Sequence, residues 1–190
     1  MYKYACSKKI WKADKEHGDH MHDVVLPHYI YLWGRNLKID TTNGGKLDRQ
    51  FSIDVITTDM KHIKNHIQEK FQRFEKAHYK TVTIEYMSNV DYNIEGAFFH
   101  MNVDYYIMGY ASEDNTDFEH LWVLPWNLLK YWISNHFTED GLKKLLEYNY
   151  KHSRANFLAI PRKWIPDDLI VYEYHRKNTL MGFNGGNGGL

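Results

Sequence analysis

The sequence has one cysteine, Cys6, in 190 residues, which excludes a disulfide within the chain and favours a reducing compartment. No apolar run approaches the roughly 20 residues that a membrane-spanning helix needs. The first residues, MYKYACSKKIW, contain no apolar signal core. Charge of one sign is not in excess either, because 24 Lys and Arg balance 24 Asp and Glu, so a global basic signal for nucleic acid is missing. We therefore predict a cytoplasmic protein with no membrane partner.

Several catalytic signatures are also missing. The chain has no GxxxxGK[ST] phosphate loop, which argues against an ATPase, and no Ser-His-Asp arrangement follows from its spacing. His17, His20 and His22 lie together in HGDHMHD, but this spacing matches no closed zinc site and no cysteines accompany it. We interpret these histidines as structural or incidental, and a transition-metal cluster is the alternative.

What is present suffices for one folded domain. Hydrophobic residues make up 43% of the chain and aromatic residues 16%, which is enough apolar material for a sizeable core. We predict a single domain over residues 1–180. The last stretch, residues 181–190, reads MGFNGGNGGL and is expected to be a disordered glycine-rich tail.

The order of the elements indicates an α/β fold, with a mixed central β-sheet of about five strands flanked by helices. The stretch over residues 24–39, interrupted by Pro27 and Gly34, is expected to be a short helix or a strand. Helices are expected at residues 126–134 and 140–150. Strands are expected at residues 50–58, 61–74, 80–88, 97–111, 119–125, 157–161 and 169–175.

Three of these strands carry polar side chains where a half-buried strand should be apolar. Asp54 interrupts FSIDVI, Gln68 and Lys70 lie two residues apart in HIQEKF, and Glu85 lies within VTIEY. Residues two apart in a strand point to the same face. Burying such groups costs several kcal/mol unless they pair or bind a metal. We therefore predict that these side chains share a site.

Metal-assisted phosphodiester hydrolysis is the chemistry that fits this set. The Asp54 carboxylate and the Gln68 side-chain oxygen can ligate a hard cation such as Mg²⁺. Lys70 beside that cation can stabilise the charge on a phosphate and orient the attacking water. The alternative is ordinary polar alternation on surface strands.

A helix over residues 61–74 is a second alternative, and it would separate Gln68 from Lys70. Apolar residues recur there at helical spacing, at Ile63, Ile67, Phe71 and Phe74. We prefer a strand, because His62 and the pair Asn65-His66 are poor helix formers and the proposed chemistry needs a strand after Asp54.

Three short motifs connect these residues. They read D-x-Q-x-x-I-D over residues 48–54, I-Q-E-K-F over residues 67–71 and T-I-E-Y over residues 83–86. Together they resemble the PD-(D/E)XK nuclease superfamily, in the variant where glutamine replaces the second acid to give D…QxK. The later runs VDYYIMGY and HLWVLPW are similar to the following strands of these nucleases, so the resemblance covers roughly residues 46–130.

The resemblance implies a role for each matched residue. Asp54 matches the metal-binding aspartate, Gln68 the second acid and Lys70 the catalytic lysine, with Gln50 and Glu85 in support. Mg²⁺ or Mn²⁺ is the implied cofactor, with Asp54 and Gln68 as its ligands. The resemblance also implies a restriction-endonuclease-like fold.

The sequence departs from the superfamily pattern at two points. Ser52 stands where these nucleases usually have glycine, and no proline precedes Asp54. The uncharged Gln68 also implies weaker metal binding than an acid would give. An upstream helix often adds an acid to such sites, and Glu16 and Asp23 are equal candidates.

We predict a Mg²⁺-dependent endodeoxyribonuclease of restriction, repair or phage type, with DNA as its partner. The segment Met60–Lys80 carries six Lys or Arg against two acids, which suits a phosphate backbone, although a solvated strand face explains it equally well. One rival is a decayed nuclease that binds nucleic acid or a partner protein, such as a phage or host inhibitor. Another is an interaction protein of unrelated α+β fold. The sequence leaves open whether the protein forms a homodimer.

Overall fold

The computed structural model describes residues 8–42, 45–149 and 154–176, and within them the strands form two sheets. The larger sheet is mixed, because β3 and β6 run parallel while all its other neighbours are antiparallel. Its six strands, which lie side by side in chain order, are β1 (Lys38–Thr41), β2 (Val55–Thr58), β3 (Lys64–Gln72), β6 (Tyr105–Ala111), β7 (Phe118–Pro125) and β10 (Tyr172–His175).

The smaller sheet is antiparallel and has four strands in the order β5-β4-β9-β8. These strands are β4 (Thr81–Asn89), β5 (Ile94–Glu95), β8 (Leu146–Asn149) and β9 (Ala155–Pro161). The α-helices of the described chain are α1 (Lys8–Trp33), α2 (Lys46–Phe51), α3 (Ala97–His100), α4 (Trp126–His136) and α5 (Glu139–Lys144). Three short 3₁₀ helices complete it, namely η1 (Phe74–Tyr79), η2 (Arg162–Trp164) and η3 (Asp167–Leu169).

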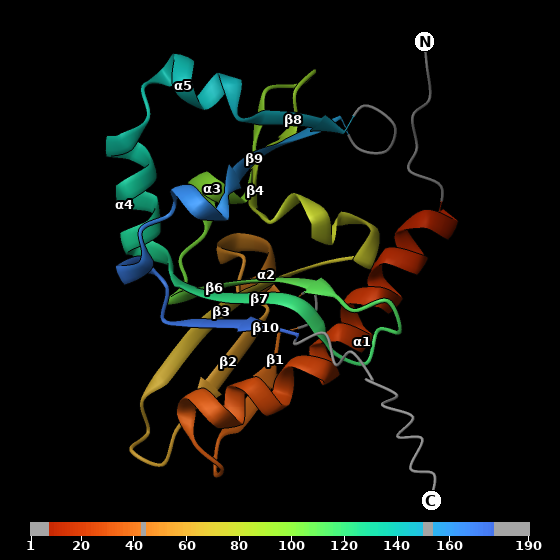
Figure 1. Cartoon of the computed structure of the whole chain (residues 1–190), viewed down its shortest axis with the longest axis vertical. Coiled ribbons are helices and arrows are strands. Elements are labelled where there is room, and N and C mark those ends of the chain that lie inside the picture. Colours follow the sequence, from red (N-terminus) through yellow and green to blue (C-terminus); the bar gives the residue numbers. More distant parts are fainter. Residues whose placement is uncertain (1–7, 43–44, 150–153, 177–190) are drawn as a thin grey trace, which may run out of the picture.

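The long helix α1 covers one face of the six-stranded sheet (Figure 1). Met21, Val25 and Tyr29 are fully buried, and their spacing of four residues places them on one side of the helix. They belong to one apolar cluster with strand residues such as Ile67 and Ile107. Pro27 lies inside the helix on its exposed side, away from this contact.

The smaller sheet and α4 lie on the other side of the larger sheet (Figure 1). Strand β4 contacts β6 through Thr83, whose main-chain oxygen accepts a hydrogen bond from Tyr106 and whose hydroxyl lies 3.7 Å from the sulfur of Met108. A second apolar cluster fills this space with residues from both sheets and from α4, including Trp126 and Ile84. The molecule is therefore layered as α1, the larger sheet, and a third layer that the smaller sheet and α4 form together.

The predicted α/β class with helices flanking a mixed sheet is confirmed. The segment over residues 61–74 contains strand β3, paired with β2 and with β6, so the helical alternative is wrong. Strands β7 and β9 and helix α4 also lie where the sequence predicts them. No helix of the described residues is long and apolar enough to cross a membrane.

Several expected elements differ from the observed ones. The strand predicted at residues 50–58 begins only at Val55, because helix α2 ends at Phe51 and Ser52 reverses the chain with a φ of 53°. The strand predicted at residues 97–111 begins at Tyr105, after α3. The strand predicted at residues 80–88 forms, but its main neighbour is β9, so it leaves the central sheet for a second one.

Elements nearer the two ends of the chain also differ from the predicted ones. Residues 24–39 belong mostly to α1, which extends back to Lys8 and whose buried side chains Met21, Val25 and Tyr29 recur at helical spacing. The helix predicted at residues 140–150 stops at Lys144, and β8 replaces its second half by pairing with β9. The last predicted strand starts at Tyr172, since η3 occupies the preceding residues. The predicted tail at residues 181–190 lies outside the described residues.

Candidate active site between the two sheets

A cavity of about 250 Å³ lies between the two sheets, where strands of both meet α2 and α3. Strand β3 of the larger sheet contributes Gln68 and Lys70, and strand β4 of the smaller sheet contributes Glu85. The remaining lining residues are Asp48, Ser52, Ala97, Met101, Tyr106 and Phe157. The cavity therefore combines two carboxylates, an amide and an ammonium group with an aromatic wall.

Gln68 and Lys70 reach the same cavity because β3 is a regular strand in this region. The strand pairs without interruption with β6 from Ile67 to Gln72, so residues two apart share a face. Ile67 and Glu69 point to the opposite face, where α1 packs. The predicted alternation therefore places Gln68 and Lys70 on the face of β3 that lines the cavity, and Ile67 and Glu69 on the face that packs against α1.

Asp54 is fixed to β3 by three hydrogen bonds. Its main-chain N–H donates to the oxygen of Ile67 at 2.9 Å. Its carboxylate Oδ2 accepts from Gln68 Nε2 at 2.5 Å and from the main-chain N–H of Glu69 at 2.9 Å. The residue immediately precedes β2, so the start of that strand places its carboxylate over Gln68.

Burial raises the pKa of the Asp54 carboxyl to about 7, since the charged form is poorly solvated there. The N–H of Glu69 acts against this rise, while the charges of Glu69 and Asp48 add to it and the Lys70 ammonium again opposes it. The carboxyl therefore keeps its proton to a much higher pH than an exposed aspartate does. A cation bound at this oxygen would replace the proton.

The Gln68 amide is oriented by two acceptors. Its Nε2 donates to Asp54 Oδ2 and, at 3.0 Å, to the main-chain oxygen of Glu69. Its Oε1 has no hydrogen-bond donor among the residues that the structure describes, which leaves it available to a ligand. The two hydrogen bonds of Nε2 therefore fix the Gln68 side chain, and its Oε1 is free to contact a ligand in the cavity.

Lys70 carries the positive charge of the cavity. Its Nζ lies 5.5 Å from the centroid of the Phe157 ring, a cation–π distance, and it forms no ion pair within the described part of the chain. Glu85 lies on the opposite wall, close to Gly96. A Cβ at position 96 would stand 2.7 Å from the Glu85 main-chain oxygen and 2.9 Å from its Cγ, so only glycine allows this approach.

Glu69 forms a network on the reverse face of β3. Both its carboxylate oxygens lie 3.0 Å from His22 Nδ1, and the Tyr29 hydroxyl donates to Oε1. The hydrogen bond to Glu69 raises the pKa of His22, while burial and the nearby Glu69 charge raise the pKa of Tyr29 well above its usual value. Helix α1 therefore holds, through Glu69, the strand segment whose N–H orients Asp54.

Asp54 itself does not line the cavity but contacts Gln68, which does, and three further candidates do not line it either. Gln50 is exposed on α2 and does not line it. Glu16 pairs with Lys12 at 3.6 Å and Asp23 is exposed, and both are on α1, which covers the opposite face of the larger sheet. Sequence reasoning in turn missed Tyr106 and Phe157, and it did not single out Asp48, although Asp48 begins the first motif.

The three histidines of HGDHMHD diverge along α1. His22 contacts Glu69, His20 Nε2 lies 2.8 Å from the main-chain oxygen of Asn115, and His17 Nε2 is buried without a partner among the described residues. These contacts point in different directions. The interpretation as structural histidines therefore agrees with their positions better than a shared metal site does.

Oxygen donors at the cavity suit a hard divalent cation better than a soft one. The Gln68 amide and the carboxylates of Asp48 and Glu85 line the cavity, and Asp54, outside the lining, contacts Gln68. In the described residues, no three His, Cys, Asp or Glu side chains converge tightly enough to hold a metal ion. A cation held by this set would therefore take only one or two protein ligands and keep several waters, as Mg²⁺ does.

No protein-family model, curated protein or solved structure matches the chain. The function is therefore inferred from the geometry of the cavity.

Proposed function

We propose that this protein is a metal-dependent nuclease that hydrolyses phosphodiester bonds of DNA in the cavity between its two sheets. The observation that carries the proposal is the arrangement on β3. Gln68 and Lys70 face one cavity, and Gln68 is hydrogen-bonded to the partly buried carboxylate of Asp54. A carboxylate and an amide in contact, beside a lysine without an ion pair in the described chain, supply the oxygen ligands and the positive charge that phosphodiester hydrolysis requires.

Each residue has a distinct role in this proposal. Asp54 and Gln68 would hold Mg²⁺ or Mn²⁺, which when bound polarises the phosphate and lowers the pKa of a water. Lys70 places its ammonium against the phosphate, where negative charge increases in the transition state. The N–H of Glu69 keeps the Asp54 carboxylate in position throughout.

DNA is the proposed substrate because basic residues follow the same chain segment. Lys61 and Lys64 are exposed at the start of β3, and Lys76 and Lys80 are exposed just beyond its end. Such lysines suit the phosphate backbone of a polymer that enters the cavity. A restriction-endonuclease-like fold and a cytoplasmic location, the latter favoured by the single cysteine, belong to the same proposal.

A second candidate function is a decayed nuclease that binds nucleic acid or a partner protein without cleaving it. The orientation of Gln68 favours it, because the amide turns its nitrogen, and not its oxygen, toward Asp54. The raised pKa of the Asp54 carboxyl also favours it, because a bound proton competes with a cation for this group. In this alternative the Asp54–Gln68 pair is a neutral hydrogen bond that stabilises the fold.

A plasmid-cleavage assay separates the two candidates. Supercoiled plasmid and a linear duplex are incubated with the purified protein in Mg²⁺, in Mn²⁺ and in EDTA. We expect nicking or linearisation with either metal, none in EDTA, and a loss of at least 10²-fold in Asp54→Ala.

The matched control is Asp168→Ala, which removes an exposed carboxylate from η3, remote from the cavity lining. Equal activity in the wild type and Asp54→Ala would refute the proposal. DNA binding by the wild type without any cleavage in either metal would select the decayed nuclease.

A further inference from the structure

Two histidines face each other across the last two strands of the larger sheet. His175 of β10 lies directly opposite His120 of β7 in the antiparallel register, and β10 has no second neighbour among the described strands. Side chains at opposite positions of such a pair share a face, with Cβ atoms about 4.5–5.5 Å apart. The Nδ1 atoms of the two rings lie only 2.7 Å apart. The edge of the sheet therefore holds two imidazoles that direct one nitrogen each at the same point.

A contact of this length between two ring nitrogens needs one proton between them. An imidazole nitrogen either carries an N–H, which donates, or a lone pair, which accepts. One Nδ1 therefore donates to the other, and this holds whichever ring carries the proton and whatever its charge. A divalent cation that displaces this proton would be bound by both nitrogens at once.

A carboxylate behind His175 orients its ring. Glu173 Oε1 lies 3.0 Å from His175 Nε2, and the same carboxylate accepts from Trp122 Nε1 at 2.7 Å and pairs with Arg162 at 2.7 Å. Histidines that bind metals usually donate their second N–H to a carboxylate, a carbonyl or water in this way. The nitrogen of His175 that Glu173 leaves over is Nδ1, the one that faces His120.

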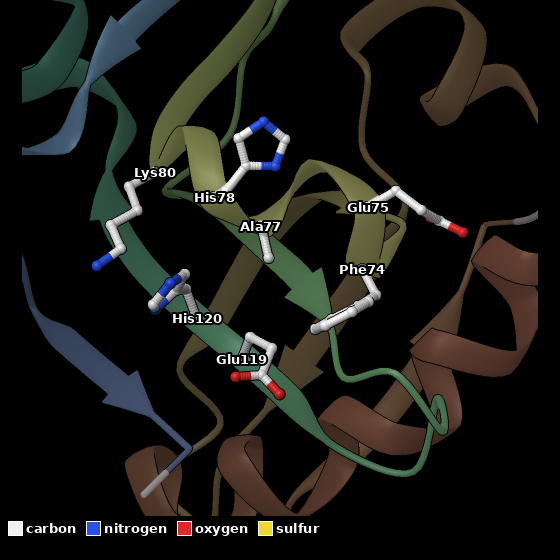
Figure 2. A pocket seen from close by; sticks show the side chains of 7 residues that line it. All are labelled: Phe74, Glu75, Ala77, His78, Lys80, Glu119 and His120. Carbon is white, nitrogen blue, oxygen red and sulfur yellow. The ribbon is translucent and has the colours of Figure 1, made fainter. Parts of the chain in front are cut away.

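Solvent reaches this pair from two sides. Figure 2 shows His120 at the edge of a second cavity, of about 270 Å³, between η1 and β7. The His175 side chain is 50% exposed. Trp122 supports the His120 ring from behind, with ring centroids 5.7 Å apart and an angle of 10° between the planes. A hydrated ion can therefore reach two rings that their neighbours already orient.

The donor atoms select a borderline cation over a hard one. Imidazole nitrogens suit Zn²⁺, Cu²⁺ and Ni²⁺, whereas Mg²⁺ takes oxygen ligands. Two Zn–N bonds of roughly 2.0–2.1 Å at a tetrahedral angle place their nitrogens about 3.3 Å apart, so the rings need to separate by about 0.6 Å. In the described residues no third His, Cys, Asp or Glu side chain converges with them, so water would complete the coordination.

The charges around the pair are mixed. The Lys80 ammonium borders the second cavity and opposes a cation, but the Glu119 carboxylate borders it too, and Glu173 adds a negative charge behind His175. The site thus has no net excess of positive charge to exclude a metal ion.

We propose that His120 and His175 bind a borderline divalent cation such as Zn²⁺ through their Nδ1 atoms, and that this ion ties the edge strand β10 to β7. Glu173 acts as a positioning residue for His175. An ion that binds the folded chain alone stabilises it by mass action, and here it adds a link to a strand that has a single neighbour in the described sheet. This site does not depend on the proposed nuclease activity, whose cation takes oxygen ligands at the first cavity.

The test uses the full chain, stripped with EDTA and then moved to chelator-free buffer at neutral pH. Zn²⁺ and Mg²⁺ are titrated separately while the histidine side chains are followed by ¹H–¹⁵N NMR and the affinity by calorimetry. We expect Zn²⁺ to shift the signals of His120 and His175 together and to raise the melting temperature, and Mg²⁺ to shift neither ring.

Four variants test the ligands. We expect His120→Ala and His175→Ala to weaken Zn²⁺ at this site by at least about tenfold, and Glu173→Gln by about tenfold or more, since loss of such a partner typically costs 10–100-fold in affinity. His20→Ala, which removes an exposed histidine of α1, is the matched control and should leave the affinity within about twofold.

His175 is exposed, so its replacement leaves the core intact and keeps the test decisive if His120→Ala fails to fold. Three results would each overturn the proposal. They are Zn²⁺ that shifts neither ring, an affinity that survives both histidine changes, and an affinity that is lost in His20→Ala instead.

Discussion

Asp54 is the residue on which the proposed function depends most. Its carboxyl has a pKa of about 7 in the folded chain against the usual aspartate value of 3.8, mainly because burial penalises the charge. The folded state therefore binds this proton more tightly than the unfolded state does. The resulting stability is present below about pH 4 and is lost as the pH rises toward 7, so above pH 7 the metal-free protein carries a buried charge.

Replacing this carboxyl by an amide should remove that cost. We expect Asp54→Asn to raise the free energy of unfolding of the metal-free protein by about 2 kcal/mol at pH 8. This is about half of the free energy that a pKa difference of about three implies, because solvent screens a partly exposed group. Near pH 4 the change should be close to zero. Urea unfolding in EDTA at both pH values measures it, and an equal effect at the two would contradict a raised Asp54 pKa.

Lys70 should affect the rate of cleavage and not the affinity for the cation. We expect Lys70→Met to reduce the cleavage rate by about 10²-fold or more, since it removes one contact to the transition state. Binding of Mn²⁺, followed by calorimetry, should stay within about threefold. Lys144→Met, which removes an exposed lysine of α5 outside the cavity lining, is the matched control. Collapse of Mn²⁺ binding with turnover intact would assign Lys70 to another role.

Among the elements, β3 does most to build the candidate site. One of its faces carries Gln68 and Lys70, and the other carries Glu69, which His22 and Tyr29 of α1 hold in place. A buried carboxylate with two donors is stable only while both remain. The helix α1 therefore contributes to the site from behind, although it lines no part of the cavity.

Tyr29→Phe tests this contact between α1 and β3. Loss of the hydroxyl leaves the Glu69 carboxylate with one donor fewer in a buried place, so we expect the free energy of unfolding to fall by about 1–3 kcal/mol. The control is Tyr31→Phe on the same helix, where the side chain is 77% exposed and the change should stay within about 0.5 kcal/mol. Urea unfolding measures both changes. Equal effects would show that the hydrogen bond from Tyr29 to Glu69 does not stabilise the fold.

The sequence predicts some elements and not others, for physical reasons. Strand β3 and its polar face follow from local alternation, because Gln68 and Lys70 had to share a side if the segment was extended. The pairing of β4 with β9, in contrast, joins residues about 75 positions apart, and no local pattern records it. Helix α2 was missed because LDRQF between a glycine turn and an apolar strand has no helical repeat long enough to detect.

At the scale of the whole molecule, the departure of β4 from the larger sheet creates the space that the proposal uses. Glu85 and Phe157 face the first cavity from the smaller sheet, while Asp48 and Tyr106 complete it from two further elements. The sequence indicated Asp54, Gln68, Lys70 and Glu85, since each is a polar interruption of an apolar run. The aromatic walls could not be recognised in advance, because tyrosine and phenylalanine are ordinary core residues until the second sheet is placed.

The most direct measurement of the central claim is the anomalous diffraction of a crystal soaked in Mn²⁺. The account predicts an anomalous peak in the first cavity at roughly 2.1 Å from an Asp54 carboxylate oxygen, with the Gln68 amide turned so that its Oε1 faces the ion. The same soak of Asp54→Ala should show no such peak. An empty first cavity in the wild type, with Gln68 Nε2 still donating to Asp54 at millimolar Mn²⁺, would contradict the assignment of this cavity as a metal-dependent nuclease site.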